Sequence, residues 1–255
     1  MLKNRVIPCL LLKNEGLVKT FQFRDPKYVG DPINIVRIFN DKEVDELVFL
    51  DIAATVNGTR PNIRLIREIA GECFMPLAYG GGLRTVEDIR TLIALGVEKV
   101  IINTRAVEDP DFIRRAADAV GSQSVVVSLD VKKNLMGRYE VYTHSGRKNT
   151  GLDPVECVAK IEGMGAGEIL LNSIDRDGTQ KGYDIELIRM VASRVSIPVI
   201  ACGGAGRTED LAAALRDGGA AAVAAGSLFV FHGKHQAVLI SYLDRTDWSE
   251  CSTRL

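Results

Sequence analysis

The sequence predicts an α/β protein that folds as one (β/α)8 TIM barrel with a twofold half-barrel repeat. Eight short apolar runs alternate with seven or eight helical stretches, which is typical of this architecture. Five residues of one stretch recur 123 positions later: Gly80, Arg84, Thr85, Gly96 and Thr104 return as Gly203, Arg207, Thr208, Gly219 and Ser227. A length of 255 residues suits a single barrel. A doubly wound sheet is the rival fold, but two repeats of four β/α units close more naturally into a barrel.

The expected strands are the apolar runs. In chain order they cover residues 5–12, 46–51, 76–78, 99–102, 124–130, 167–172, 198–202 and 221–225. A polar loop, residues 13–16, follows the first strand. Residues 138–144 alternate in polarity and predict a β-hairpin added to the end of the fifth strand. Because barrel enzymes carry their chemistry at the C-terminal ends of the strands, the site is expected there.

Helices are expected between the strands. Asp31-Pro32 and Asp153-Pro154 each begin one, with aspartate as the N-cap and proline in the first turn. The first of these two helices runs to residue 44. Further helices are expected over residues 61–72, 110–120, 208–217 and 234–243, over a stretch that ends at residue 96, and over one that begins near residue 184. The barrel therefore spans residues 1–243. Residues 244–255 lack an apolar stripe and are expected to form a loose tail.

Composition narrows the function classes. A net charge of −1 without a long Lys/Arg run argues against a dedicated nucleic-acid binder. The five cysteines are scattered without a CxxC pair, so neither a zinc site nor a disulfide framework is expected. The three histidines lack metal-ligand spacing, and we expect no metal or other cofactor. No apolar run is long enough to span a bilayer and no secretory leader is evident, which predicts a cytoplasmic protein without membrane contact.

The repeated glycine turns predict two phosphate sites that face each other. Each copy reads as a buried strand, a glycine turn and a helix, and successive backbone N–H groups in such a turn can cradle an anion. Each copy also ends in a hydroxyl residue after its next strand, Thr104 or Ser227. The alternative is that the glycines only close tight turns.

Asp130 is the strongest candidate for acid/base chemistry. It ends an apolar strand, where an unpaired carboxylate is costly to bury. Asp177 lies in an ordinary Asp-Gly turn, which weakens its case although the turn is expected over the barrel mouth. Asp51, at the end of the second strand, is a further accessory candidate that may instead orient its neighbours. Lys19, in the first loop, either reaches over the mouth toward a phosphate or is solvated.

The repeat places a leucine opposite that carboxylate. Aligning residues 8–13 on 127–132 brings Leu10 onto Leu129 and Leu11 onto Asp130. A pair of carboxylates across the mouth is therefore not available from these two positions.

The opposite face carries four charges of alternating sign. Arg5, Glu46, Lys99 and Glu168 each stand at the N-terminal start of a strand. They are expected to form a closed ring of salt bridges on the barrel floor, and their simplest role is structural closure.

Several motifs together identify a family. They are residues 45–52 (DELVFLDI), Gly80-Gly81-Gly82, Asn103-Thr104, 121–127 (GSQSVVV), 148–151 (KNTG) and 165–179 (GAGEILLNSIDRDGT). On these motifs the chain resembles HisF, the cyclase subunit of imidazole glycerol phosphate synthase, over nearly the whole predicted barrel. The resemblance implies a HisH-like glutaminase bound at the N-terminal face, which would release ammonia into the barrel.

The resemblance also assigns roles to residues. The four floor charges match the family's ammonia gate, and Asp130 matches one of two catalytic aspartates. Gly82, Asn103 and Thr104, beside Gly81, match one phosphate site of a phosphorylated small-molecule ligand. Gly204, Gly226 and Ser227, beside Gly203 and with Gly178 nearby, match the other.

Two positions depart from the family pattern. Leu11 stands where the second catalytic aspartate is expected, and Asn172 stands where threonine is usual. Losing a general acid/base typically costs two to four orders of magnitude in rate. Residues 10–14 and 229–235 resemble WbuZ-type HisF paralogues, which are associated with amidination of N-acetyl sugars for lipopolysaccharide and other surface polysaccharides. This favours an ammonia-channelling subunit that works with a sugar amidotransferase. A working cyclase of histidine biosynthesis and a non-catalytic scaffold remain as alternatives.

Overall fold

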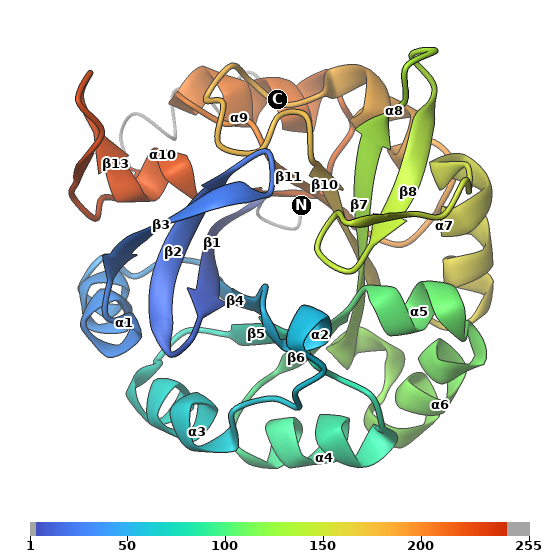
Figure 1. Cartoon of the computed structure of the whole chain (residues 1–255), viewed down its shortest axis with the longest axis horizontal. Helices are drawn as coiled ribbons and strands as arrows, with labels where there is room; N and C mark the ends of the chain where they lie inside the picture. Colours follow the sequence, from blue (N-terminus) through green and yellow to red (C-terminus); the bar gives the residue numbers. More distant parts are fainter. Residues whose placement is uncertain (1–3, 244–255) are drawn as a thin grey trace.

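The computed structural model describes residues 4–243, in which eight parallel strands close a barrel (Figure 1). In chain order these are β1 (Arg5–Lys13), β4 (Leu47–Asp51), β5 (Leu77–Gly80), β6 (Lys99–Ile102), β7 (Val125–Lys133), β10 (Glu168–Ser173), β11 (Val199–Cys202) and β12 (Ala222–Ala225). The sheet closes because β12 pairs with β1, and the two halves also meet where β6 pairs with β7. The predicted barrel is thereby confirmed.

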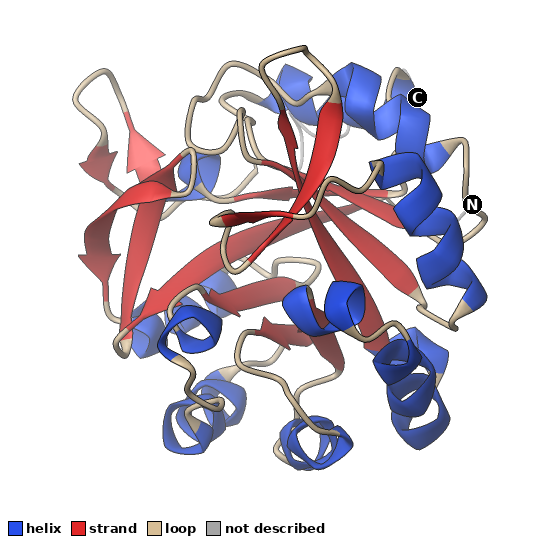
Figure 2. Ribbon diagram, turned by 45° about the vertical axis from the view of Figure 1, so that its right-hand side comes forward, coloured by secondary structure: helices blue, strands red, loops and turns tan. Residues whose placement is uncertain are grey.

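Helices surround the strands on the outside (Figure 2). They are α1 (Pro32–Asp41), α3 (Ile63–Glu72), α4 (Val86–Ala94), α5 (Thr104–Glu108), α6 (Asp111–Val120), α7 (Pro154–Gly163), α8 (Ile185–Ala192), α9 (Thr208–Arg216) and α10 (Ser227–Val230), with a 3-10 turn at Ser122–Ser124. The short α2 (Ala54–Asn57) lies instead at the mouth of the barrel. Asp31 and Asp153 cap α1 and α7 as expected, since their side chains accept hydrogen bonds from backbone N–H groups of the first turns.

The expected polar loop, residues 13–16, is present as a tight turn at Asn14 and Glu15, but the expectation that Lys19 lies in the first loop is wrong. Residues 16–30 form two further strands, β2 (Gly16–Phe21) and β3 (Arg24–Gly30), which fold back on β1 as an antiparallel hairpin. The predicted hairpin after β7 is confirmed: β8 (Tyr139–Thr143) pairs antiparallel with β7, and β9 (Lys148–Asn149) pairs with β8. Each half-barrel thus carries a hairpin on its first strand.

The expected last helix over 234–243 is also wrong. This segment contains β14 (Ala237–Val238), which pairs with β13 (Phe231–His232), and then runs on as an extended strap. Leu239 N and Ser241 N donate to the carbonyls of Val230 and Phe229, so the backbone bonds to the chain around α10 rather than to itself. The predicted tail, 244–255, lies outside the described residues.

Two apolar layers hold the barrel. The larger fills the space between strands and helices, and its largest fully buried side chains include Phe39, Phe49, Phe112 and Phe229. The smaller fills the lumen with Ile7, Cys9, Val48, Ala78, Ile101, Val126, Leu170, Ile200, Cys202, Ala222 and Ala224. The lumen below the mouth is therefore lined by small and medium apolar groups. No helix within residues 4–243 is long and apolar enough to cross a membrane.

Candidate functional site

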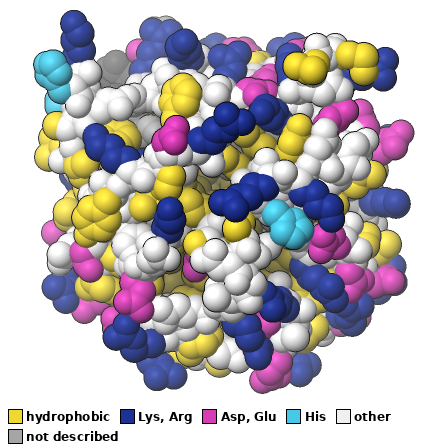
Figure 3. All heavy atoms as spheres, in the orientation of Figure 1, with side chains coloured by type: hydrophobic (Ala, Val, Ile, Leu, Met, Phe, Trp, Pro, Cys, Tyr) yellow, Lys and Arg dark blue, Asp and Glu magenta, His cyan; other side chains and the backbone are white. Residues whose placement is uncertain are grey.

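A cavity of about 1140 Å³ opens at the C-terminal ends of the strands. In Figure 3 this face is hollowed at its centre, and Lys and Arg side chains gather around the hollow. The structure brings every predicted mouth residue to this cavity: Asp51, Gly81, Gly82, Asn103, Thr104, Asp130, Asp177, Gly178, Gly203, Gly204, Gly226 and Ser227, together with Leu11, Lys19 and Asn172.

Asp130 lies at the mouth end of β7 and is buried. Burial raises the pKa of its carboxyl group to about 7, and the nearby charge of Asp177 adds to this; the Ser128 hydroxyl, which donates to Asp130 Oδ1 at 3.4 Å, opposes it. A carboxyl group with this pKa can either accept or donate a proton near neutral pH.

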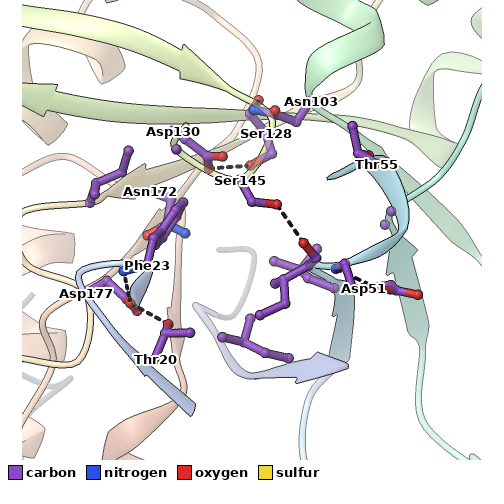
Figure 4. A pocket seen from close by; sticks show the side chains of 18 of the residues that line it. Thr20, Phe23, Asp51, Thr55, Asn103, Ser128, Asp130, Ser145, Asn172 and Asp177 are labelled. Carbon is purple, nitrogen blue, oxygen red and sulfur yellow. Dashed lines mark hydrogen bonds between the residues drawn. The ribbon is translucent and has the colours of Figure 1, made fainter. Parts of the chain in front are cut away.

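Leu11 lines the same cavity and presents no polar atom to it. The carboxylate across the mouth from Asp130 is Asp51 (Figure 4). Its Oδ1 accepts hydrogen bonds from Ala53 N and Ala54 N at 2.9 and 3.0 Å, and burial raises the pKa of the group. Asp51 thus orients the start of α2. It does not replace the aspartate that is expected at the position of Leu11.

Asp177 connects the turn after β10 to the β2–β3 hairpin. Its side chain accepts hydrogen bonds from the Thr20 hydroxyl at 2.7 Å and from Phe23 N at 3.1 Å (Figure 4). Its carbonyl accepts a further bond from Gln22 N at 3.0 Å. These contacts hold the hairpin over one side of the cavity.

Lys19 is fixed on β2 and only 6% exposed, so it is neither solvated nor in a loop. Its ammonium lies against Gly226: a Cβ added there would overlap Lys19 Nζ and would lie 2.8 Å from the Cys9 carbonyl oxygen. Glycine at 226 is what allows this approach. The structure places the cation beside one of the predicted phosphate sites.

Asn172 lies beside Asp130, in register on the neighbouring strand. It is 6% exposed, and its Oδ1 atom has no hydrogen-bond partner within the described residues. The sequence predicted Asn172 at the C-terminal end of a strand and as a departure from a family pattern, but gave it no role. The buried, unpaired oxygen marks it as part of the cavity's polar lining.

The four floor charges form the predicted ring. Lys99 Nζ lies 3.0 Å from Glu46 and 3.2 Å from Glu168, while Arg5 binds Glu168 at 2.9 Å and also pairs with Glu46. Glu46 is only 2% exposed. The ring closes the lumen at the end opposite the cavity.

No metal site is found on either face among the described residues. Residues 4–243 contain no group of three or more His, Cys, Asp or Glu side chains placed to hold a metal ion. Among the described residues, the groups at the mouth include the carboxyl groups of Asp51, Asp130 and Asp177, the buried ammonium of Lys19, amides and hydroxyls.

Comparison with known proteins places the chain among close relatives. A family model described as histidine biosynthesis protein matches residues 5–236. The chain is 57% identical over 244 residues (96% of this chain, 97% of the relative) to a Pseudomonas aeruginosa protein provisionally named imidazole glycerol phosphate synthase subunit hisF2. It is 50% identical over 248 residues (97% and 98%) to one of Leptospira borgpetersenii provisionally named subunit HisF. A Vibrio vulnificus protein provisionally named subunit hisF3 is 49% identical over 243 residues (95% and 94%).

Proposed function

The chain belongs to the histidine biosynthesis protein family as a HisF-like subunit, and from this premise we propose that it channels ammonia within a glutamine-dependent amidotransferase system. A HisH-like glutaminase binds the N-terminal face, and the ammonia it releases crosses the lumen to the mouth. There the ammonia serves amidination of an N-acetyl sugar, with the help of a separate sugar amidotransferase. The protein would work in the cytoplasm.

The floor ring and the lumen support the conduit. The ring of Arg5, Glu46, Lys99 and Glu168 is closed, so passage requires one of its ion pairs to open. Above the ring the lumen is apolar, which favours neutral ammonia over the ammonium ion.

Leu11 is the single observation that carries the choice of chemistry. Ring closure by a cyclase of this family relies on two aspartates at the mouth, and here one side of the mouth is a leucine. A mouth of this kind is better suited to passing ammonia on to an acceptor than to catalysing a reaction that requires two proton-transfer groups.

The test measures glutaminase activation. A HisH-like glutaminase is assayed for glutamate release with and without this chain, and binding is measured in parallel. We expect a complex and a gain in activity, and Lys99→Met in the ring should reduce the coupling, whereas Lys148→Met on the exposed β9 should not. If the glutaminase neither binds the chain nor gains activity from it, the proposal fails.

A second candidate is the ammonia-dependent cyclase itself. It is favoured by Asp130, whose pKa of about 7 suits a general acid or base. Turnover of the histidine-pathway bisphosphate with added ammonium salt, compared between the native chain and Leu11→Asp, separates the two. A normal native rate means a cyclase; a rate gained only by Leu11→Asp means delivery.

A further inference from the structure

The turn between β7 and β8 carries two large apolar side chains that stand in water. Leu135 is fully exposed and Met136 is 74% exposed. Among the large apolar side chains of residues 4–243, only Phe74, between α3 and β5, is exposed to a similar extent, at 85%. The hairpin projects from the mouth side beside α8, where Lys133 pairs with Glu186 at 3.4 Å (Figure 1). Two adjacent apolar side chains in such a place form a patch that a partner can cover.

The turn that presents this patch is held in shape by Asn134. Its Oδ1 accepts hydrogen bonds from Met136 N at 2.9 Å and from Arg138 N at 3.0 Å, and its backbone N–H donates to the Arg138 carbonyl at 2.8 Å. Its Nδ2 donates to Glu140 at 2.7 Å. Because the turn is already ordered, a partner that binds it loses little free energy in ordering it.

The fold does not require apolar residues at the tip of this turn. The equivalent turn of the first half-barrel, between β1 and β2, has Asn14 and Glu15 at its exposed tip. Polar residues of this kind are usual in exposed turns. The internal repeat thus supplies a turn on the same face with a polar tip, so Leu135 and Met136 need a reason other than folding.

Cations surround the apolar tip and extend to the cavity. Residues 131–152 contain five Lys/Arg residues and one acidic residue, Glu140, although the net charge of the chain is −1. The Arg138 guanidinium, next to the tip, makes no hydrogen bond or ion pair within residues 4–243. The charged groups of Lys132 and Arg147 are likewise unpaired in that part of the chain, and both residues line the cavity. The tip is therefore an apolar point in a cationic surface.

This combination fits an acidic protein surface with an apolar pocket. Two side chains and a few cations are too little for stable attachment to a membrane, where even a single fatty-acyl chain binds marginally. Nucleic acids are bound through their phosphates and by stacking on aromatic rings, and Leu135 and Met136 offer no ring. A protein pocket can enclose both side chains, and the flexible Met136 can adapt to its shape.

We propose that the tip of the β7–β8 hairpin is the docking site of the enzyme that accepts the ammonia. This enzyme presents an apolar pocket for Leu135 and Met136 within an acidic surface. β7 leads from the cavity, where Asp130 lies, directly to the tip, so a partner held there covers the mouth and keeps water from the ammonia in transit. The inference rests on the proposed function, because it identifies the face on which the acceptor binds.

The test measures binding of the full chain to a purified N-acetyl-sugar amidotransferase of the same organism by surface plasmon resonance. The double variant Leu135→Ser, Met136→Ser should weaken binding at least about tenfold, whereas Phe74→Ser should change it less than about twofold. At low salt, Arg138→Glu should slow association about threefold or more, and Arg194→Glu, an exposed arginine between α8 and β11, should not. Circular dichroism checks that each variant is folded.

Activation of a HisH-like glutaminase, measured for the same proteins, separates this docking site from ammonia channelling. The double variant should activate the glutaminase as the native chain does, because its barrel floor is intact. If the amidotransferase binds the double variant as tightly as the native chain, the docking site is wrong while channelling stands. If the amidotransferase does not bind the native chain, the docking site is overturned together with amidination as the destination of the ammonia.

Two controls test the other possible occupants of the tip. Sedimentation velocity measures whether the native chain self-associates, and flotation with vesicles that contain phosphatidylglycerol measures whether it binds an anionic membrane. We expect a monomer that does not float. Self-association or flotation that the double variant abolishes would show that a second copy or a membrane covers the tip, and would overturn the proposal.

Discussion

Glu46 and Glu168 share the same two cations, Arg5 and Lys99, on the floor of the barrel. Glu168 is the first residue of β10 and Glu46 immediately precedes β4, the second strands of the two half-barrels. The floor is therefore one network rather than two separate pairs, and each charge compensates two others.

Removing one charge from this network should destabilise the barrel. Glu46→Gln leaves Arg5 and Lys99 with one carboxylate between them at a site where Glu46 is 2% exposed. We expect a loss of about 3 kcal/mol in the free energy of unfolding, measured by urea titration. Glu15→Gln, which breaks an exposed pair with Arg64 at 2.8 Å, should cost much less, because water screens a pair on the surface. Equal losses would mean that the floor ring is no stronger than a surface pair.

Asp130 should make stability fall as pH rises from about 4 to 7. Its folded-state pKa of about 7 lies above the ordinary value, so the folded chain holds a proton in this window that the unfolded chain has released. The unfolding free energy of the native chain should therefore decline relative to that of Asp130→Asn, by up to about 4 kcal/mol at pH 8. Urea titrations at several pH values check this. A constant difference between the two proteins would show that the carboxyl group titrates normally.

Asp177→Ala should loosen the β2–β3 hairpin without unfolding the barrel. The variant loses the bonds to Thr20 and Phe23, and we expect faster hydrogen exchange in residues 16–30, measured by mass spectrometry. Asp25→Asn, on the exposed part of the same hairpin, is the control and should exchange at the native rate. Unchanged exchange in Asp177→Ala would mean that the backbone contacts alone hold the hairpin.

Two glycine substitutions should have opposite effects on stability. Gly226→Ala brings a methyl group against Lys19 Nζ and within 2.8 Å of the rigid Cys9 carbonyl, so the unfolding midpoint should fall. Gly163→Ala, at the end of α7 with no atom within 4 Å of the new methyl group, should be neutral or stabilising by up to about 1 kcal/mol. Thermal unfolding of both variants is the measurement, and a tolerated Gly226→Ala would refute the tight approach of Lys19.

The barrel and the composition of its mouth were predictable because they depend on local patterns. Apolar runs mark the strands, and the glycine turns recur with Thr104 and Ser227 at a fixed offset. These patterns predict which residues line the mouth because the C-terminal ends of parallel strands lie at one rim, whatever the conformations of the loops.

The wrong predictions concern segments whose burial depends on contacts with residues that are distant in the sequence. β2 has four buried residues in succession, Leu17 to Thr20, so it lacks the alternation by which a half-buried strand is recognised. For Lys19 the sequence left two roles open, reaching over the mouth or being solvated, because no sequence pattern reveals the space that Gly226 leaves for its side chain. The supposed last helix has Val238, Leu239 and Ile240 in succession, a run that serves an extended strap as well as a helix.

That strap also brings the two ends of the described chain together. The Tyr242 hydroxyl donates to the Val6 carbonyl at 2.7 Å, so the last described residues return to the start of β1. A duplicated half-barrel whose ends meet in this way is cyclic in its connectivity, although the polypeptide is linear. The two halves could therefore be written in the reverse order, joined near residue 243 and opened at Gly121, without altering any strand pairing. The fold therefore does not depend on the order in which the two halves follow one another along the chain.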